Sequence, residues 1–414
     1  MNHQIPNYLK TRESICLVGV VSSLLLALLF IMDTNLWADV DHYWNNINDW
    51  YDHGLIPYKD YVFEYPPFSL VIFLIPRIFS WDLNSFHYSY AILCMIAYVI
   101  AARCTLKMID DENAKTYAMI LLILIPLFSI RFIITRNDIF AVAGIIIALY
   151  LMKNNHKRAS LVIIAIAAMI KIYPILVILP IIAYYLSKKD YKKITECLII
   201  PILTCIIIEI PFLIIDSSSA FDYLSYHSDR NIQIESIAAT IMYAAYALGL
   251  TSLHYDNSSG SENIVGELPD MISPYMNFIL VIGLVLIVMM LIFLFKKNRI
   301  ENNYLKTLII SFAIVILTFI VLNKVYSAQY MLWILGLMPL VIWAVRKERD
   351  RKFTFILTVL FGLSSAIAAK HYSGSNFLNP DFVILECIKN IFTIALLILC
   401  IHLLRKIASN NQED

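Results

Sequence analysis

The stretch ASLVIIAIAAMIKIYPILVILPIIAYYL, residues 159–186, decides the fold class of this protein. It is apolar over almost its whole length, as is typical of segments that enter a membrane, where a full crossing needs about 20 residues. Lys171, Tyr173 and Pro174 interrupt it in the middle. Because proline lacks a backbone N–H and disfavours helix at the preceding residue, the stretch predicts two short helices joined by a break. Broken helices at membrane depth are tolerated only where they line a cavity enclosed by protein.

The composition of the chain points in the same direction. Of its 414 residues, 60% are hydrophobic and 15% are charged, whereas soluble domains have about 45–50% and about 25%. No soluble core could bury this much apolar surface, so the chain is predicted to be an all-α polytopic membrane protein. The sequence has no long basic stripe and no nucleic-acid-binding motif, so no nucleic-acid partner is expected. Its seven cysteines lie mostly in apolar runs, and none of them forms a CxxC motif. They are therefore interpreted as small core residues and not as partners in disulfides.

Basic residues indicate which loops face the cytoplasm, because cytoplasmic loops carry an excess of Lys and Arg. If all basic clusters lie on that side, the segments between them cross an even number of times, and the N-terminus (1–14) and the tail (406–414) are cytoplasmic. The first outer loop is then 33–87 and the second outer region is 216–273. The clusters are Lys10 with Arg12, Arg103 with Lys107 and Lys115, 153–158, 188–193, 296–299, 346–352, and Arg405 with Lys406.

We expect a single transmembrane domain over 15–405, with about nine full spans and several short or re-entrant helices. The run 15–32 lacks a small-x-small cleavage site before Asp33, so it is interpreted as a retained first span. The first outer loop is expected to carry amphipathic helices, and its run 68–79 is too short to span. The runs 117–130 and 139–152 are predicted as a hairpin of short helices. The other runs read as spans are 88–106, 194–215, 274–295, 304–322, 327–345, 353–370 and 384–404.

Two acidic residues follow the first span directly. Asp39 and Asp41 lie at the mouth of that span, and Glu64 and Tyr65 close the same loop. A carboxylate near a low-dielectric surface can act as a general base on a hydroxyl. The alternative is an ordinary solvated acidic loop. His42, Tyr43 and Trp44 favour an interfacial position for this segment.

Cations at membrane depth are costly and indicate function. RFIITRND (131–138) brings Arg131, Arg136 and Asp138 together; Arg suits phosphate recognition, and Asp138 could orient Arg136. The alternative is a structural salt bridge between these two residues. Lys171 lies too far from either cytoplasmic end to extend back there, so a phosphate or a carboxylate partner is expected.

Two further segments mix one cation with amides and aromatic residues. YHSDRNIQIES (226–236) contains Arg230, and NKVYSAQYMLW (323–333) contains Lys324. Such mixtures bind sugar hydroxyls and phosphates, but they also cap ordinary helices. The sequence has no Gly-rich phosphate loop, no HExxH and no His pair at metal spacing. Asp39 and Asp41 could hold a metal, but the sequence does not demand one, and no cofactor is expected.

Together these motifs resemble the multi-pass GT-C glycosyltransferases, and above all glycosyltransferase family 87, the polyprenyl-phosphate-mannose-dependent mannosyltransferases. The resemblance rests on ADVDHY, GLIPYKDYVFEYPP, RNDIFAVAGIIIALYL, KIYPILVILP, YHSDRNIQIES and NKVYSAQYMLW, which lie in this order over about residues 15–345. It implies a cell-membrane enzyme that transfers a sugar, with mannose favoured, from a polyprenyl phosphate to a lipid or glycan hydroxyl on the outer face. The transfer would invert the anomeric carbon.

The resemblance also implies roles for single residues. Asp39 would be the general base, with Asp41 as the rival candidate, and no metal or nucleotide would be required. The donor phosphate would be bound by Lys171, Arg230, Arg136 and Lys324. The residues expected to contact the sugar or the acceptor are Tyr43, Glu64, Tyr65, Asp138, His227 and Gln329.

Two other functions use similar features. A transporter or flippase of a lipid-linked sugar also has broken helices and charges at depth, but should show two related halves, which this sequence lacks. A surface-polysaccharide polymerase shares the donor lipids, but its large outer loop usually lies late in the chain.

Overall fold

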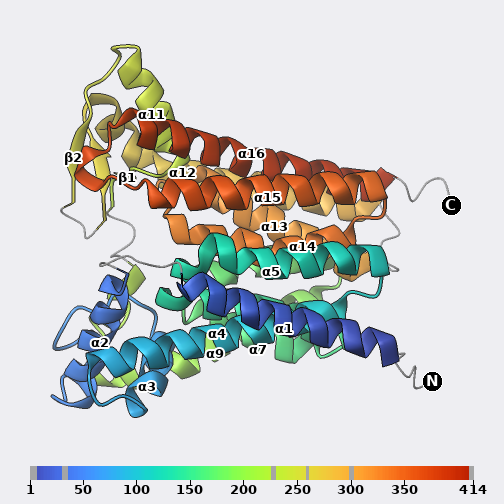
Figure 1. Ribbon diagram of the computed structural model, residues 1–414, viewed down its shortest axis with the longest axis horizontal. Coiled ribbons are helices and arrows are strands. Elements are labelled where there is room, and N and C mark those ends of the chain that lie inside the picture. The colour runs from blue at the N-terminus through green and yellow to red at the C-terminus, as the bar shows by residue number, and fades with distance from the viewer. Residues whose placement is uncertain (1–6, 30–35, 225–229, 258–260, 298–302, 410–414) are drawn as a thin grey trace.

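The computed structural model describes residues 7–29, 36–224, 230–257, 261–297 and 303–409. Its long helices run side by side, and both ends of the chain lie at one end of the bundle, on the right in Figure 1. The long helices are α1 (Asn7–Leu29), α4 (Leu83–Met108), α5 (Glu112–Thr135), α9 (Tyr191–Ile215), α12 (Glu267–Lys297), α13 (Tyr304–Leu322), α15 (Glu348–Lys370) and α16 (Pro380–Ser409).

Shorter helices connect and interrupt the long ones. They are α2 (Ala38–Tyr51), α3 (Phe68–Ile78), α6 (Asp138–Lys153), α7 (Lys157–Ala168), η1 (Tyr173–Val177), α8 (Ile178–Lys188), α11 (Ile237–Ala247), η3 (Ala328–Tyr330), α14 (Met331–Ala344) and η4 (Gly374–Asn376). The described residues also contain one small antiparallel sheet, with its strands in the order β1-β3-β2. Its strands are β1 (Ile232–Gln233), β2 (His254–Asp256) and β3 (Asn263–Val265).

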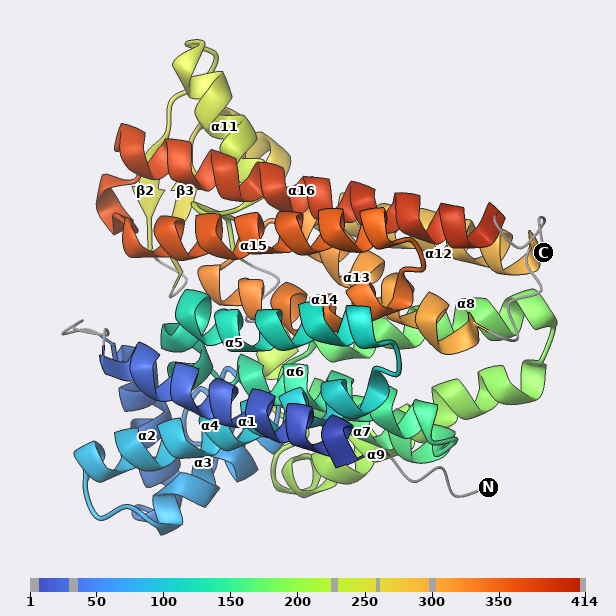
Figure 2. The ribbon, with the colours of Figure 1, turned by 45° about the vertical axis from the view of Figure 1, so that its right-hand side comes forward.

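Eight helices of the described residues are long and apolar enough to cross a membrane, so the chain is an all-α polytopic membrane protein. The elements of the first loop and of the 216–273 region, α2, α3, α11 and the sheet, gather at the end of the bundle opposite the termini (Figures 1 and 2). The two polar regions that the sequence pattern assigns to one side therefore do lie together.

Two expected helix lengths were wrong. The run 117–130 belongs to α5, which has 24 residues and a hydropathy typical of a full span. Arg131 interrupts the apolar run in the sequence, but the helix continues past it to Thr135, with a kink at Ser129. Conversely, 327–345 forms no single span: it divides into η3 and α14, which has 14 residues.

The break predicted between residues 159 and 186 is confirmed. Helix α7 ends at Ala168, η1 begins at Tyr173 with Pro174 in its first turn, and α8 follows. The backbone carbonyl of Met169, in this break, accepts a hydrogen bond of 2.9 Å from the N–H of Phe68 at the start of α3. The first loop is thus attached directly to the interrupted helix.

Burial divides the helices into inner and outer ones. In the most apolar stretch of α13, 72% of the residues are buried, against 11% in α9 and 17% in α12. Isoleucine, leucine and phenylalanine side chains cover the exposed faces of α9 and α12. Exposed apolar surface of this extent suits contact with lipid chains.

The first loop packs through aromatic rings. Helix α2 buries Val40, Tyr43 and Ile47, and the ring of Tyr43 stacks on Phe73 of α3 with centroids 4.3 Å apart. The edge of Tyr65 meets both rings. This packing fixes the orientation of the first turn of α2, which carries Asp39.

Candidate active site

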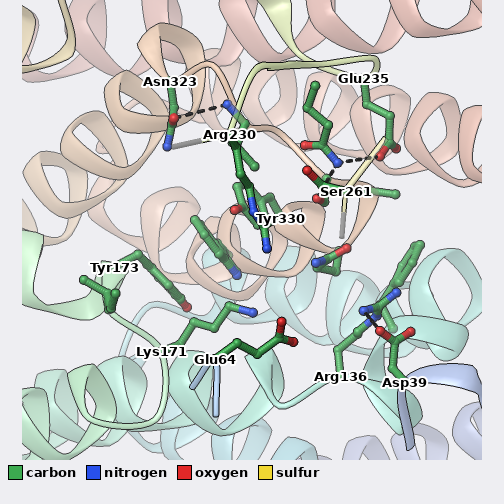
Figure 3. Close-up of a pocket in the computed structure, with 18 of the residues that line it drawn as sticks. Asp39, Glu64, Arg136, Lys171, Tyr173, Arg230, Glu235, Ser261, Asn323 and Tyr330 are labelled. Atoms are coloured by element: carbon green, nitrogen blue, oxygen red, sulfur yellow. Dashed lines mark hydrogen bonds and ion pairs between the residues drawn. The ribbon is translucent and has the colours of Figure 1, made fainter. Parts of the chain in front are cut away.

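A cavity of about 530 Å³ opens between the first loop, the broken helix and the loop that carries β1. Its polar side chains come from segments far apart in the sequence (Figure 3). Eight of the twelve residues expected from the sequence line it: Asp39, Tyr43, Glu64, Tyr65, Arg136, Lys171, Arg230 and Gln329.

Asp39 and Arg136 face each other at one side of this cavity (Figure 3). The guanidinium of Arg136 donates a hydrogen bond from Nη1 to Oδ1 of Asp39. The side chain of Arg136 keeps 25% of its surface exposed and that of Asp39 keeps 32%, so both charges remain accessible to a molecule in the cavity. Arg136 pairs with Asp39 and not, as considered from the sequence, with Asp138.

Asp41 points elsewhere, although it lies in the same helical turn. Residues two positions apart do not share a helix face, and Asp41 does not line the cavity. Its Oδ1 lies 2.6 Å from Nε2 of His87, and the ring of His87 stacks on Trp37. The geometry distinguishes two carboxylates that the sequence left as alternatives.

The two arginines reach the cavity from the end of α5. Pro126 lies inside this helix, and Ser129 departs from helical geometry with φ −136° and ψ 15°. Proline removes a backbone hydrogen bond and kinks a helix. The kink comes directly before Arg131, which lines the cavity together with Arg136.

Lys171 projects into the cavity from the break between α7 and η1. Its Nζ lies 3.3 Å from Oδ2 of Asp138. The other carboxylate oxygen of Asp138 accepts a hydrogen bond of 2.7 Å from the indole of Trp333. Trp333 is stacked between the rings of Tyr173 and Tyr330, with centroids 3.7 Å away on each side. The ion pair therefore holds the broken helix against α6, and the stack of three aromatic rings holds it against α14.

Three expected site residues lie elsewhere. Asp138 is fully buried behind the wall, where it supports Lys171 and Trp333, so it cannot contact a sugar directly. Lys324 is buried outside the cavity lining, and its backbone carbonyl accepts a hydrogen bond from the N–H of Gln233. His227 lies outside the described residues.

A second group of polar residues, not predicted from the sequence, lies on the opposite side of the cavity. Glu235 and Ser261 lie above Lys171 and Arg136 in Figure 3, and Gln233, Glu262 and Tyr372 also line the cavity. Gln233 and Glu235 belong to YHSDRNIQIES, where roles were predicted only for Arg230 and His227. No pattern in the sequence signals Tyr372, which lies in the last third of the chain.

The cavity therefore has a cationic side and an acidic side. Arg131, Arg136 and Lys171 suit a phosphate, whereas Glu235 and Glu262 offer hydrogen-bond acceptors. Burial raises the pKa of Glu235 to about 8, although the nearby ammonium of Lys389 opposes this rise. Among the described residues, no group of three or more His, Cys, Asp or Glu side chains is arranged to hold a metal ion.

Comparison with known proteins names a family. The sequence model described as glycosyltransferase family 87 matches residues 63–318, which is more than half of the chain. No curated protein matches the sequence. Among solved structures, the chain is similar to the crystal structure of ArnT from Cupriavidus metallidurans bound to undecaprenyl phosphate. The two are 10% identical with a TM-score of 0.49, and the match covers 95% of this chain and 77% of that chain.

Proposed function

This chain belongs to glycosyltransferase family 87, and from this premise we propose that it transfers a sugar from a polyprenyl-phosphate donor to a hydroxyl group of a lipid or glycan. The observation that carries the proposal is the cavity itself. It holds a carboxylate and several cations within one space, between helices whose apolar outer faces can receive a lipid chain.

In this proposal the cationic side binds the donor phosphate. Arg136, Lys171 and Arg230 all line the cavity. The phosphate gains negative charge as its bond to the sugar breaks, and fixed cations stabilise that charge in the transition state. Charges in a site from which water is partly excluded act more strongly than in bulk solvent.

Asp39 is the proposed general base. The acceptor oxygen attacks the anomeric carbon from the face opposite the phosphate, and its proton passes to the carboxylate of Asp39. The polyprenyl phosphate leaves with the electron pair of the broken bond, and the configuration inverts. In this structure Asp39 is paired with Arg136. A donor phosphate that binds Arg136 competes for the guanidinium and leaves the carboxylate available to the acceptor.

The aromatic side chains of the first loop contribute the remaining contacts. Tyr43 and Tyr65 line the cavity beside Glu64, and aromatic faces suit the apolar face of a sugar ring. Gln329 offers an amide to hydroxyl groups from the other wall. We propose mannose as the sugar, the outer face of the cell membrane as the site of transfer, and no requirement for a metal or a nucleotide.

A transfer assay tests this function. Purified protein is incubated with polyprenyl-phosphate-mannose that carries a label in the sugar, together with a membrane extract as the source of acceptors. We expect the label to appear in a new product. If the label crosses the bilayer of a vesicle without joining any product, the protein is a flippase and the proposal is wrong.

A further inference from the structure

The acidic side of the cavity presents acceptor oxygens that no group in the described structure satisfies. Oε1 of Glu235 and Oε1 of Gln233 are buried and have no hydrogen-bond partner. The two residues are 4% and 5% exposed, and both line the cavity. Buried polar atoms are almost always paired, so these two oxygens indicate a ligand that supplies hydrogen-bond donors.

The other polar atoms of these side chains are already engaged. Nε2 of Gln233 donates to Oγ of Ser327 at 2.8 Å and to Oε2 of Glu235 at 3.4 Å. This amide orientation turns the carbonyl oxygen of Gln233, and not its NH₂ group, toward a ligand. The carbonyl oxygen of Gln233 can only accept a hydrogen bond, whereas the carboxyl of Glu235 accepts one or, when protonated, donates one. Together they fit sugar O–H groups, which both donate and accept.

The backbone beneath this pair is held by three other segments. The N–H of Gln233 donates to the carbonyl of Lys324 at 2.9 Å, and the N–H of Ile234 donates to the carbonyl of Glu262 at 3.1 Å. Nζ of Lys389, from α16, donates to the carbonyl of Glu235 at 3.1 Å. A site with fixed backbone binds without the cost of ordering a loop.

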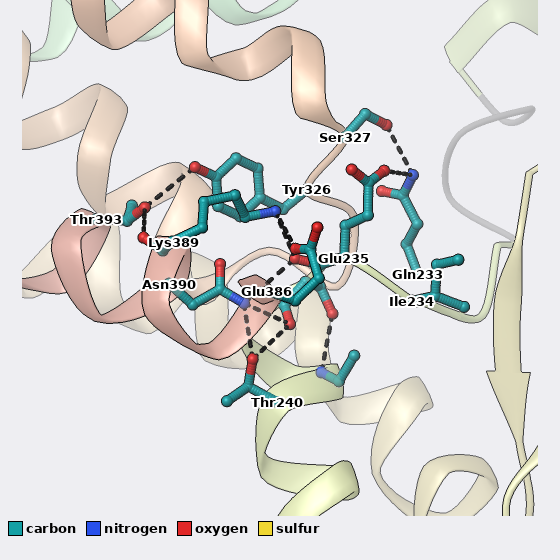
Figure 4. Close-up of polar contacts among 12 residues, drawn as sticks. Gln233, Ile234, Glu235, Thr240, Tyr326, Ser327, Glu386, Lys389, Asn390 and Thr393 are labelled. Carbon is teal, nitrogen blue, oxygen red and sulfur yellow. Dashed lines mark hydrogen bonds and ion pairs between the residues drawn. The ribbon is translucent and has the colours of Figure 1, made fainter. Parts of the chain in front are cut away.

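Helix α16 also explains why Glu235 stays available (Figure 4). The ammonium of Lys389 pairs with Glu386 from the same helix and lies 4.2 Å from the ring centroid of Tyr326. Asn390 donates to the carbonyls of Glu235 and Ser236. Lys389 is thus committed to another carboxylate and to the backbone, and the side chain of Glu235 lines the cavity.

We propose that Glu235 and Gln233 form a subsite that binds the hydroxyl groups of a sugar, opposite the cations that bind phosphate. The subsite deepens the proposed function and rests on it. The sugar can be that of the donor lipid or that of the acceptor glycan, since both offer the same hydroxyl chemistry. In this arrangement the phosphate of the ligand lies at one side of the cavity and the sugar lies at the other.

Lipid binding to the purified full-length protein tests the subsite. The probes are polyprenyl-phosphate-mannose, polyprenyl-phosphate-glucose and sugar-free undecaprenyl phosphate. The variants are Glu235→Met, which removes both oxygen atoms of the side chain, and Glu235→Gln, which keeps one of them. Glu267→Gln, on the exposed first turn of α12, is the matched control. We expect Glu235→Met to weaken binding of a sugar-bearing lipid about ten- to hundredfold, and Glu235→Gln to weaken it less.

Sugar-free undecaprenyl phosphate decides how the result is interpreted. Its binding should be the same in the wild type and in all variants, which also shows that the variants fold. A loss confined to the sugar-bearing lipids supports a donor-sugar subsite. Unchanged lipid binding with a raised KM for the acceptor extract in the transfer assay supports an acceptor-sugar subsite.

Two results would overturn the inference. If Glu235→Met leaves both lipid binding and the acceptor KM unchanged, or weakens all three lipids equally, the subsite does not exist as described, while the proposed function stands. If the wild type binds none of the three lipids, the proposed function fails and the subsite fails with it.

Discussion

The guanidinium of Arg136 at the end of α5 contacts the carboxylate of Asp39 in the first turn of α2, across 97 residues of sequence. The contact joins the proposed base to a proposed phosphate ligand inside one cavity. It makes the two charges interdependent, because a substrate that engages one of them changes the surroundings of the other.

Replacement of Arg136 should weaken donor binding. Arg136→Gln removes a charge-assisted hydrogen bond to phosphate and should lower affinity for undecaprenyl phosphate about ten- to hundredfold. Arg136→Lys keeps the charge but loses the planar fork, so an intermediate loss is expected. Titration of the purified variants with the lipid measures this. Unaltered affinity in Arg136→Gln would show that the phosphate binds elsewhere.

Asp39 and Asp41 should differ sharply in catalysis. Asp39→Asn removes the proposed base and should lower turnover at least about a hundredfold, the scale typical of general base catalysis. Asp41→Asn should stay within a few fold of the wild type, because Asp41 pairs with His87 outside the cavity. Single-turnover transfer at saturating donor measures both. The opposite ranking would assign the base to Asp41.

Lys171 should act on the phosphate from the break in the helix. Lys171→Gln is expected to weaken undecaprenyl phosphate binding and to slow transfer, since one cation is lost from the cavity. Lys192→Gln, in the first turn of α9, is a control with the same change of charge at an exposed position. Equal effects of the two variants would mean that general electrostatic attraction, and not a specific contact, explains the loss.

The stability of the protein should depend on pH through Glu235. Burial raises the pKa of this carboxyl from 4.5 to about 8, so between these values the folded chain binds a proton that the unfolded chain has released. The free energy of unfolding must then decrease as pH rises through this window. Above pH 8 the folded protein carries the buried charge, and this contribution to stability is lost.

Glu235→Gln isolates this effect. Lys389 lowers the pKa of Glu235, whereas Glu386 and Glu262 raise it, and all three stay in place in the variant. Thermal unfolding in detergent at pH 6 to 9 should therefore show that the stability of the variant increases relative to that of the wild type as pH rises. Parallel curves would indicate that Glu235 titrates at its ordinary pKa.

The buried ion pair of α16 should be sensitive to the loss of one partner. Lys389 and Glu386 are both 1% exposed. Lys389→Met leaves an unpaired buried carboxylate and should cost about 3–5 kcal/mol of stability, whereas replacing both residues by Met should cost much less. Thermal unfolding of the single and double variants measures this. Equal destabilisation by both would show that Lys389 stabilises the fold by its packing alone.

Much of the architecture follows from the sequence because apolar run length and proline chemistry are local properties. The break at Pro174, the short helix beginning at Phe68 and the separation of polar loops from termini are all of this kind. The length of α5 is not a local property of this kind, since a sequence cannot show whether Arg131 ends a helix or projects from its side.

The candidate site was predictable where a charge stood out against apolar surroundings, as at Lys171 and Arg136. Sequence alone could not separate Asp39 from Asp41, because their difference arises from the face that α2 presents after packing. Glu235 and Tyr372 escaped notice for another reason. Their contribution depends on where β1 and the end of α15 lie in space, and no local pattern encodes that contact.

The wall of the cavity is assembled from segments near both ends of the sequence, from Asp39 in α2 to Tyr372 after α15, and α16 fastens the loop that carries Glu235. During synthesis, α1 and α2 leave the ribosome hundreds of residues before α16 does. In a nascent chain the loop that carries Glu235 is therefore not fastened until α16 has entered the bilayer. A chain truncated before α16 would carry the residues that line the cavity without the contacts that hold this loop in place.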